Sequence, residues 1–102
     1  MSRIETLKNL LESNPADEFT RYALALEYVS INEQDNAEEH FKELLANSPN
    51  YLAVYYQYGK LLEEKGETEE ARKIYNQGLF VAASQNDLRT KTELQDAIDN
   101  LF

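Results

Sequence analysis

Cysteine is absent from the 102-residue chain. This absence excludes a disulfide scaffold and a zinc site with thiolate ligands, and it suits a reducing compartment, so we expect a cytoplasmic protein. No apolar run approaches the roughly 20 residues that a membrane-spanning helix needs, so we expect no membrane segment. Glutamates interrupt the apolar pattern of residues 1–15, which is not typical of a signal peptide.

Basic residues are few. Nineteen aspartates and glutamates stand against ten lysines and arginines, and the formal net charge is -9. A phosphate backbone needs lysine and arginine for counterion release, so nucleic acid is disfavoured as a partner, and anionic membrane surfaces are disfavoured for the same reason. The charge balance weakly favours a basic or neutral protein partner.

Residues that carry chemistry are also scarce. His40 is the only histidine, and we expect it to be solvated on an acidic helix face rather than to bind a metal. The three glycines are explained by helix packing and turns, so no phosphate-binding loop is indicated. No serine has a histidine base at suitable spacing, and adjacent carboxylates such as Glu69 and Glu70 diverge on a helix. We therefore expect no catalytic residue, no metal site, no cofactor and no enzymatic activity.

Apolar residues recur at spacings of three and four along the whole chain, which predicts about six helices and no strand. Asn14-Pro15 and Ser48-Pro49 mark two breaks, and Gly66 is the expected C-cap of the fourth helix. Asp35 with Glu38 predicts a capping box for the third helix, and Thr68 is the expected N-cap of the fifth. The expected apolar positions of the six helices, in chain order, are Ile4, Leu7, Leu10 and Leu11; Leu24, Ala25, Tyr28 and Ile31; Ala37, Phe41, Leu44 and Leu45; Tyr51, Leu52, Tyr55, Tyr58, Leu61 and Leu62; Ala71, Ile74, Tyr75, Leu79 and Phe80; and Leu94, Ala97, Ile98 and Leu101.

The chain resembles itself when it is shifted by 34 residues. Pro15 then falls on Pro49, and Asn32 falls on Gly66, both residues that tolerate a left-handed turn between helices. Small and aromatic positions repeat as well, as the pairs Ala25/Gly59, Ala37/Ala71 and Phe41/Tyr75. The shift predicts half a repeat (1–17), two full repeats (18–51 and 52–85) and a final capping half (86–102) within a single domain.

This pattern resembles the tetratricopeptide repeat family. Its residues in the first full repeat are Leu24, Ala25, Tyr28, Ala37, Phe41, Leu44 and Pro49, and in the second they are Tyr55, Gly59, Leu62, Ala71 and Tyr75. The chain departs from the family pattern at Arg21, where a large residue is usual, and at Ala83, where proline is usual. The resemblance implies an all-α fold, an α-solenoid of antiparallel helix pairs, in which stacked pairs share the core.

The second predicted helix is apolar on more than one face. Its core stripe leaves Phe19, Tyr22, Leu26 and Val29 as a second stripe, for which the helix itself has no use. In the family that this chain resembles, the first helix of each repeat lines a concave, partner-binding groove. The resemblance and the 34-residue shift together give the expected binding residues of both repeats: Phe19, Tyr22, Leu26 and Val29, and Ala53, Tyr56, Lys60 and Glu63.

The expected partner is a protein or peptide, and an apolar segment flanked by lysine or arginine suits the aromatic and acidic side chains. Some family members clamp a terminal carboxylate with basic groove residues, but Tyr22, Leu26 and Gln57 hold the corresponding positions here. Two alternatives stay open at this point. The second stripe of helix two is covered by the first helix or by the tail with Phe102, or it pairs with its copy in a two-fold homodimer.

Overall fold

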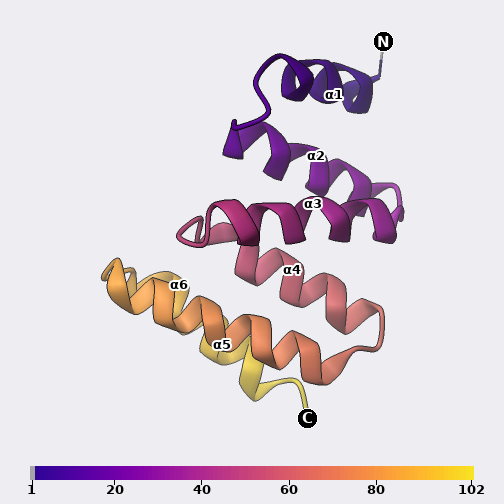
Figure 1. Cartoon of the computed structure of the whole chain (residues 1–102). Coiled ribbons are helices and arrows are strands. Elements are labelled where there is room, and N and C mark those ends of the chain that lie inside the picture. Colours follow the sequence, from indigo (N-terminus) through magenta and orange to yellow (C-terminus); the bar gives the residue numbers. More distant parts are fainter. Residues whose placement is uncertain (1) are drawn as a thin grey trace. The chain divides into compact units, whose positions relative to one another are not determined.

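The computed structural model describes residues 2–102, which form six α-helices and no strand (Figure 1). Every helix that the periodicity predicts is present, with its ends within a few residues of the expected ones. The helices are α1 (Arg3–Ser13), α2 (Glu18–Ser30), α3 (Gln34–Asn47), α4 (Ala53–Glu64), α5 (Thr68–Ser84) and α6 (Leu88–Asp99).

Proline starts the same turn at two places 34 residues apart. After α1 the Asp17 N–H donates to the Asn14 carbonyl at 3.1 Å, and after α3 the Tyr51 N–H donates to the Ser48 carbonyl at 2.9 Å. Pro15 and Pro49 each occupy the second position of such a turn, which suits their fixed φ. The repeated sequence signal is therefore a repeated backbone hydrogen bond.

The other three interhelical turns share a left-handed residue. Asn32 (φ 61°), Gly66 (φ 79°) and Asn86 (φ 56°) each follow a helix by two positions. In each turn the next N–H reaches back five residues to a carbonyl of the last helical turn, as from Glu67 to Leu62 at 2.8 Å. This is the Schellman pattern, which satisfies carbonyls that a helix end leaves unpaired.

Two of the predicted N-caps are wrong. Helix α3 begins at Gln34, so Asp35 lies inside its first turn, and α5 begins with Thr68 rather than after it. Glu33 and Glu67 hold the cap positions, and neither side chain caps the helix by accepting from a backbone N–H. The preceding turn determines where both helices begin. In each case the left-handed residue, Asn32 or Gly66, is followed by a single cap residue, and the next helix begins directly after it.

The chain divides into two compact units, residues 1–51 and residues 52–102. In the first unit α2 packs against both α1 and α3. Its core consists of side chains that these three helices bury together. They are Leu7, Leu11, Leu24, Ala25, Tyr28, Ala37, Phe41 and Leu44.

In the second unit α5 packs against both α4 and α6. Glycine allows two close approaches here. A Cβ atom on Gly59 of α4 would lie 2.2 Å from the Tyr75 ring, and one on Gly78 of α5 would lie 2.6 Å from the Cβ atom of Tyr55. The glycines at positions 59 and 78 thus have one cause, namely that the neighbouring helix lies too close to leave space for a side chain.

Some expected core positions are exposed instead. Ile31 is 53% exposed, because α2 ends at Ser30 and residue 31 has already left the helix face. Leu10 and Phe80 are also exposed, on helix faces turned to solvent. Tyr51 lies outside α4, in the turn after Pro49, and the next residue, Leu52, is the N-cap of that helix.

Candidate functional site

The second stripe of α2 is defined by Phe19, Tyr22, Leu26 and Val29, at spacings of three, four and three. The opposite face of the helix is buried in the core of the first unit. On the stripe, Phe19 is 69% exposed and the other three side chains are half-buried. The structure therefore leaves this stripe open to solvent in part.

The ring of Tyr51 covers part of the α2 stripe. The rings of Tyr22 and Tyr51 meet edge to face with centroids 5.4 Å apart. Burial raises the pKa of the Tyr51 phenol, and the nearby Glu18 and Asp17 carboxylates raise it further. A residue of the turn after α3 thus covers part of the stripe, which the sequence pattern did not indicate, because Tyr51 fitted the spacing of the fourth helix.

The edge of α2 beside this stripe carries charge. The Arg3 Nε atom donates to the Glu27 carboxylate at 2.7 Å, which links α1 to α2. At the start of the helix, the Asp17 side chain caps α2 by accepting from the Phe19 and Thr20 N–H groups. Ten acidic residues against four basic ones in residues 1–51 make this unit strongly negative.

The predicted set on α4 consists of Ala53, Tyr56, Lys60 and Glu63, with the same spacing. Ala53 is exposed and the other three are half-buried. The Lys60 ammonium lies 5.5 Å from the centre of the Tyr56 ring and 3.6 Å from the Glu63 carboxylate. The structure thus brings three of these four residues into one cluster, held by a cation–π contact and an ion pair.

Tyr56, Lys60 and Glu63, which we call the α4 cluster, are connected to the core of the second unit by Tyr75. The ring of Tyr75 is fully buried, and its hydroxyl donates a short hydrogen bond to the Glu63 carboxylate. The Tyr56 and Tyr75 rings lie 6.3 Å apart at an angle of 44°. Burial, and then the Glu63 hydrogen bond, raise the pKa of Tyr75 well above its usual range. Glu63 therefore has a structural partner behind the surface.

A polar contact that the sequence did not predict joins α2 to α3. The Arg21 guanidinium lies 3.1 Å from His40 Nδ1, and the His40 ring stacks on Tyr28 with centroids 5.7 Å apart. Burial, and then the positive charge of Arg21, lower the pKa of His40. The expectation of a solvated histidine is thus wrong, and Arg21, which departs from the family pattern, contacts the histidine.

Two further findings concern the part of the chain that the structure describes. Within residues 2–102, no group of three or more histidine, aspartate and glutamate side chains is placed to hold a metal ion. None of the helices in that range combines the length and the apolar character that crossing a membrane requires.

The sequence model of the family described as "Tetratricopeptide repeat" matches residues 32–91, more than half of the chain. The chain belongs to the tetratricopeptide repeat family. The resemblance seen in the sequence is thereby confirmed, as is the predicted all-α helical-repeat class. Tetratricopeptide repeats generally mediate protein–protein interactions.

Relatives of similar length support the assignment. A TPR repeat-containing protein of Pseudomonas aeruginosa is 28% identical over 91 residues, which are 89% of this chain and 87% of that protein. The solution structure of a tetratricopeptide repeat domain protein from Salinibacter ruber is 39% identical, with a TM-score of 0.82, over 86% of this chain and 89% of that one. A protein from Bordetella parapertussis superimposes with a TM-score of 0.85 at 27% identity, over 99% of this chain and 88% of that one.

Proposed function

We propose that this tetratricopeptide repeat protein is a non-enzymatic scaffold that binds a protein or peptide segment. The proposed contact surfaces are the α2 stripe on the first unit and the α4 cluster, with Ala53, on the second. Each surface offers a tyrosine, the residue type that interfaces favour as an anchor. The cytoplasmic location and the repeat boundaries expected from the sequence accompany this proposal as predictions.

One observation carries the proposal. The α2 stripe keeps a phenylalanine 69% exposed beside half-buried Tyr22, Leu26 and Val29. The first unit has already buried the other apolar face of the same helix, including Leu24 and Ala25. A second apolar face gives the folded chain little stability, so a partner that covers it is the better explanation.

Charge indicates the chemistry of the partner. The α2 stripe lies on a unit with a large acidic excess, and Asp17, Glu18 and Glu27 stand close to it in the chain. We expect an apolar segment with flanking lysine or arginine, since the apolar part provides affinity and the charges speed association. Salt should then slow association more than it speeds dissociation.

The test is a selection of random peptides on the immobilised protein, followed by calorimetry with the selected peptides. The double variant Tyr22→Ser/Leu26→Ser should keep its helicity and lose peptide binding. Phe80→Ser, which removes an exposed ring elsewhere, is the matched control and should bind like the wild type. Peptides that bind the double variant as tightly as the wild type contradict the proposal.

The homodimer through the α2 stripe stays a second prediction from the sequence. Phe102 lies with its ring 5.8 Å from the Arg72 guanidinium and is 79% exposed, so the tail ends beside α5. Light scattering on the Tyr22→Ser/Leu26→Ser variant separates the two uses of the stripe. A dimer that this variant dissociates supports the homodimer, and a wild-type monomer at high concentration contradicts it.

A further inference from the structure

The second half of α5 has an exposed face without charge. Residues 74–86 contain no aspartate, glutamate, lysine or arginine. Phe80 lies four residues before the end of α5 and is 80% exposed, so its ring is almost entirely in solvent. In a chain with a net charge of -9, an uncharged surface around an exposed aromatic ring is the composition of an interface core.

The surface around this ring is hollowed. Four residues of α5, namely Asn76, Leu79, Phe80 and Ala83, line a shallow hollow of about 320 Å³. We call these four residues the Phe80 face. Their spacing of i, i+3, i+4 and i+7 is that of the hole that receives a side chain of a facing helix in knobs-into-holes packing. The Phe80 face thus has both a hollow that can receive a side chain and an exposed ring, that of Phe80, that can fill such a hollow on another molecule.

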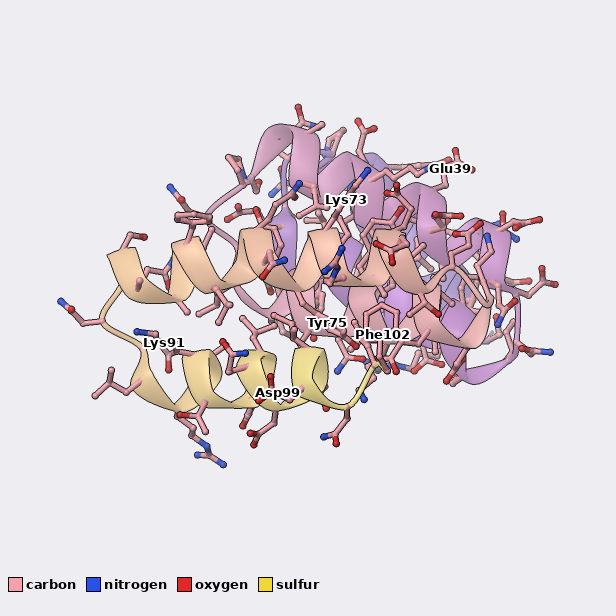
Figure 2. All side chains as sticks on the ribbon, turned by 90° about the horizontal axis from the view of Figure 1, so that it is seen from below. Glu39, Lys73, Tyr75, Lys91, Asp99 and Phe102 are labelled. Atoms are coloured by element: carbon pink, nitrogen blue, oxygen red, sulfur yellow. The ribbon has the colours of Figure 1, made fainter. Side chains whose placement is uncertain are left out.

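Charged residues border the uncharged stretch at both of its ends in the sequence. Lys73 precedes Phe80 by seven positions and Asp87 follows it by seven. Figure 2 shows Lys73 on the side of α5 away from α6, and Phe80, seven positions on, lies on the same face of the helix. Asp87 lies beyond the end of α5. Its N–H donates to the Ala82 carbonyl at 2.9 Å, and its carboxylate caps α6 by accepting from the Thr90 N–H and hydroxyl.

We propose that the Phe80 face binds a second copy of this chain, with the two α5 helices antiparallel about a two-fold axis near Phe80. Each Phe80 ring enters the hollow of the other copy, which is the self-complementarity that a two-fold interface requires.

Charge favours this occupant over a charged partner. Two copies of an acidic chain repel one another, and the repulsion is least where both surfaces lack charge.

The first test is sedimentation equilibrium from micromolar to millimolar concentration. The wild type should dimerise, and Phe80→Asp should raise the dissociation constant about 100-fold, the loss typical of a central aromatic anchor. Phe102→Asp changes a ring of equal exposure and should dimerise like the wild type. Tyr22→Ser/Leu26→Ser separates this contact from a dimer through the α2 stripe: a dimer through the Phe80 face persists in that variant, whereas a dimer through the α2 stripe dissociates.

A cross-link tests the orientation. The chain has no cysteine, so Asn76→Cys and Ser84→Cys each introduce a single thiol. Both positions are exposed and lie four residues from Phe80, so they face each other only in the antiparallel dimer. A short bis-maleimide should link the mixture of the two variants and neither variant alone.

Three results overturn the proposal: a wild-type monomer throughout the concentration range, a dimer that Phe80→Asp leaves intact, or cross-linking of each variant with itself. Phe80 is exposed, so at a concentration at which the wild type is monomeric Phe80→Asp should have the wild-type thermal midpoint. That measurement separates a lost interface from a lost fold.

Discussion

The Tyr75 hydroxyl on α5 donates a hydrogen bond to the Glu63 carboxylate on α4, and so ties the core of the second unit to a residue of its proposed binding surface. Glu63 also lies 3.6 Å from the Lys60 ammonium. A carboxylate with two partners is held in place, so the surface around Tyr56 is pre-organised rather than mobile.

Tyr75→Phe should lower the free energy of unfolding by about 1 kcal/mol, because it removes one hydrogen bond to a carboxylate that solvent still reaches. The variant should also change the alkaline limb of the stability curve. The folded state raises the pKa of Tyr75, so the unfolded state ionises first and stability falls as the pH rises above 10.

Urea denaturation from pH 8 to 11 measures this effect. The fall should be shallower in Tyr75→Phe, and some should remain, since burial also raises the pKa values of Tyr51 and Tyr55. Identical slopes in the variant and the wild type would contradict the raised pKa of Tyr75, and with it the burial and the Glu63 hydrogen bond that cause it.

The titration of His40 should make the free energy of unfolding depend on pH on the acid side of neutrality. Its pKa is lowered from 6.5 by burial, by Arg21 and more weakly by Lys8, against the opposing effect of Glu39 and Glu43. The unfolded chain therefore takes up the proton first. The stability that neutral His40 contributes is complete above pH 6.5 and is lost as the pH falls towards the lowered folded value.

His40→Asn keeps a hydrogen-bond acceptor near the Nδ1 position and removes the titration. Between pH 7 and pH 5 the variant should lose less stability than the wild type in chemical denaturation. Equal losses would mean that carboxylates alone cause the acid dependence in this range.

Gly59→Ala and Gly78→Ala should each destabilise the protein, although alanine is the better helix former by about 1 kcal/mol. The added methyl group would meet the Tyr75 ring in one case and the Cβ atom of Tyr55 in the other. Overpacking of this kind costs about 1–3 kcal/mol. Gln77→Ala, at an exposed position of α5, is the control and should leave the thermal midpoint unchanged or raise it slightly.

The left-handed turns respond to substitution in opposite directions. Gly66→Ala should destabilise by about 1 kcal/mol, because its φ of 79° is unfavourable for a residue with a Cβ atom, and nothing packs there to compensate. Asn32→Gly should be neutral or slightly stabilising, since glycine accepts the same φ without strain. Thermal denaturation of the two variants checks the pair, and a stable Gly66→Ala would contradict the assigned turn.

Much of the fold was predictable because the 34-residue repeat reflects backbone constraints. Pro15 and Pro49 start equivalent turns, and Asn32 and Gly66 adopt equivalent left-handed conformations. Errors arose where one residue decides between two environments. Phe80 has the spacing of a core residue, but the helix turns it to solvent, since Tyr75, Gly78 and Ala82 form the buried face of α5.

The surface residues were predictable as positions and not as contacts. The shift of 34 residues indicates which faces of α2 and α4 correspond. It carries no information on the ring of Tyr51 against Tyr22 or the reach of Tyr75 to Glu63, because both contacts depend on side-chain length and on the approach of a second element. Arg21 with His40 was missed for the same reason.

The α2 stripe should be less important for stability than the core face of the same helix. Tyr28→Ser removes a buried ring and should cost about 3–5 kcal/mol. Tyr22→Ser should cost clearly less, because its ring is half exposed and has the Tyr51 ring on one side. Equal losses for Tyr22→Ser and Tyr28→Ser in chemical denaturation would mean that the stripe belongs to the core.

The most direct measurement is calorimetric titration of one peptide, selected on the wild-type protein, into the wild type, Tyr22→Ser/Leu26→Ser and Phe80→Ser. We predict that binding is lost in the double variant, whose helicity persists, and is unchanged in Phe80→Ser. Equal affinity for all three proteins would contradict the claim that the α2 stripe is a binding surface.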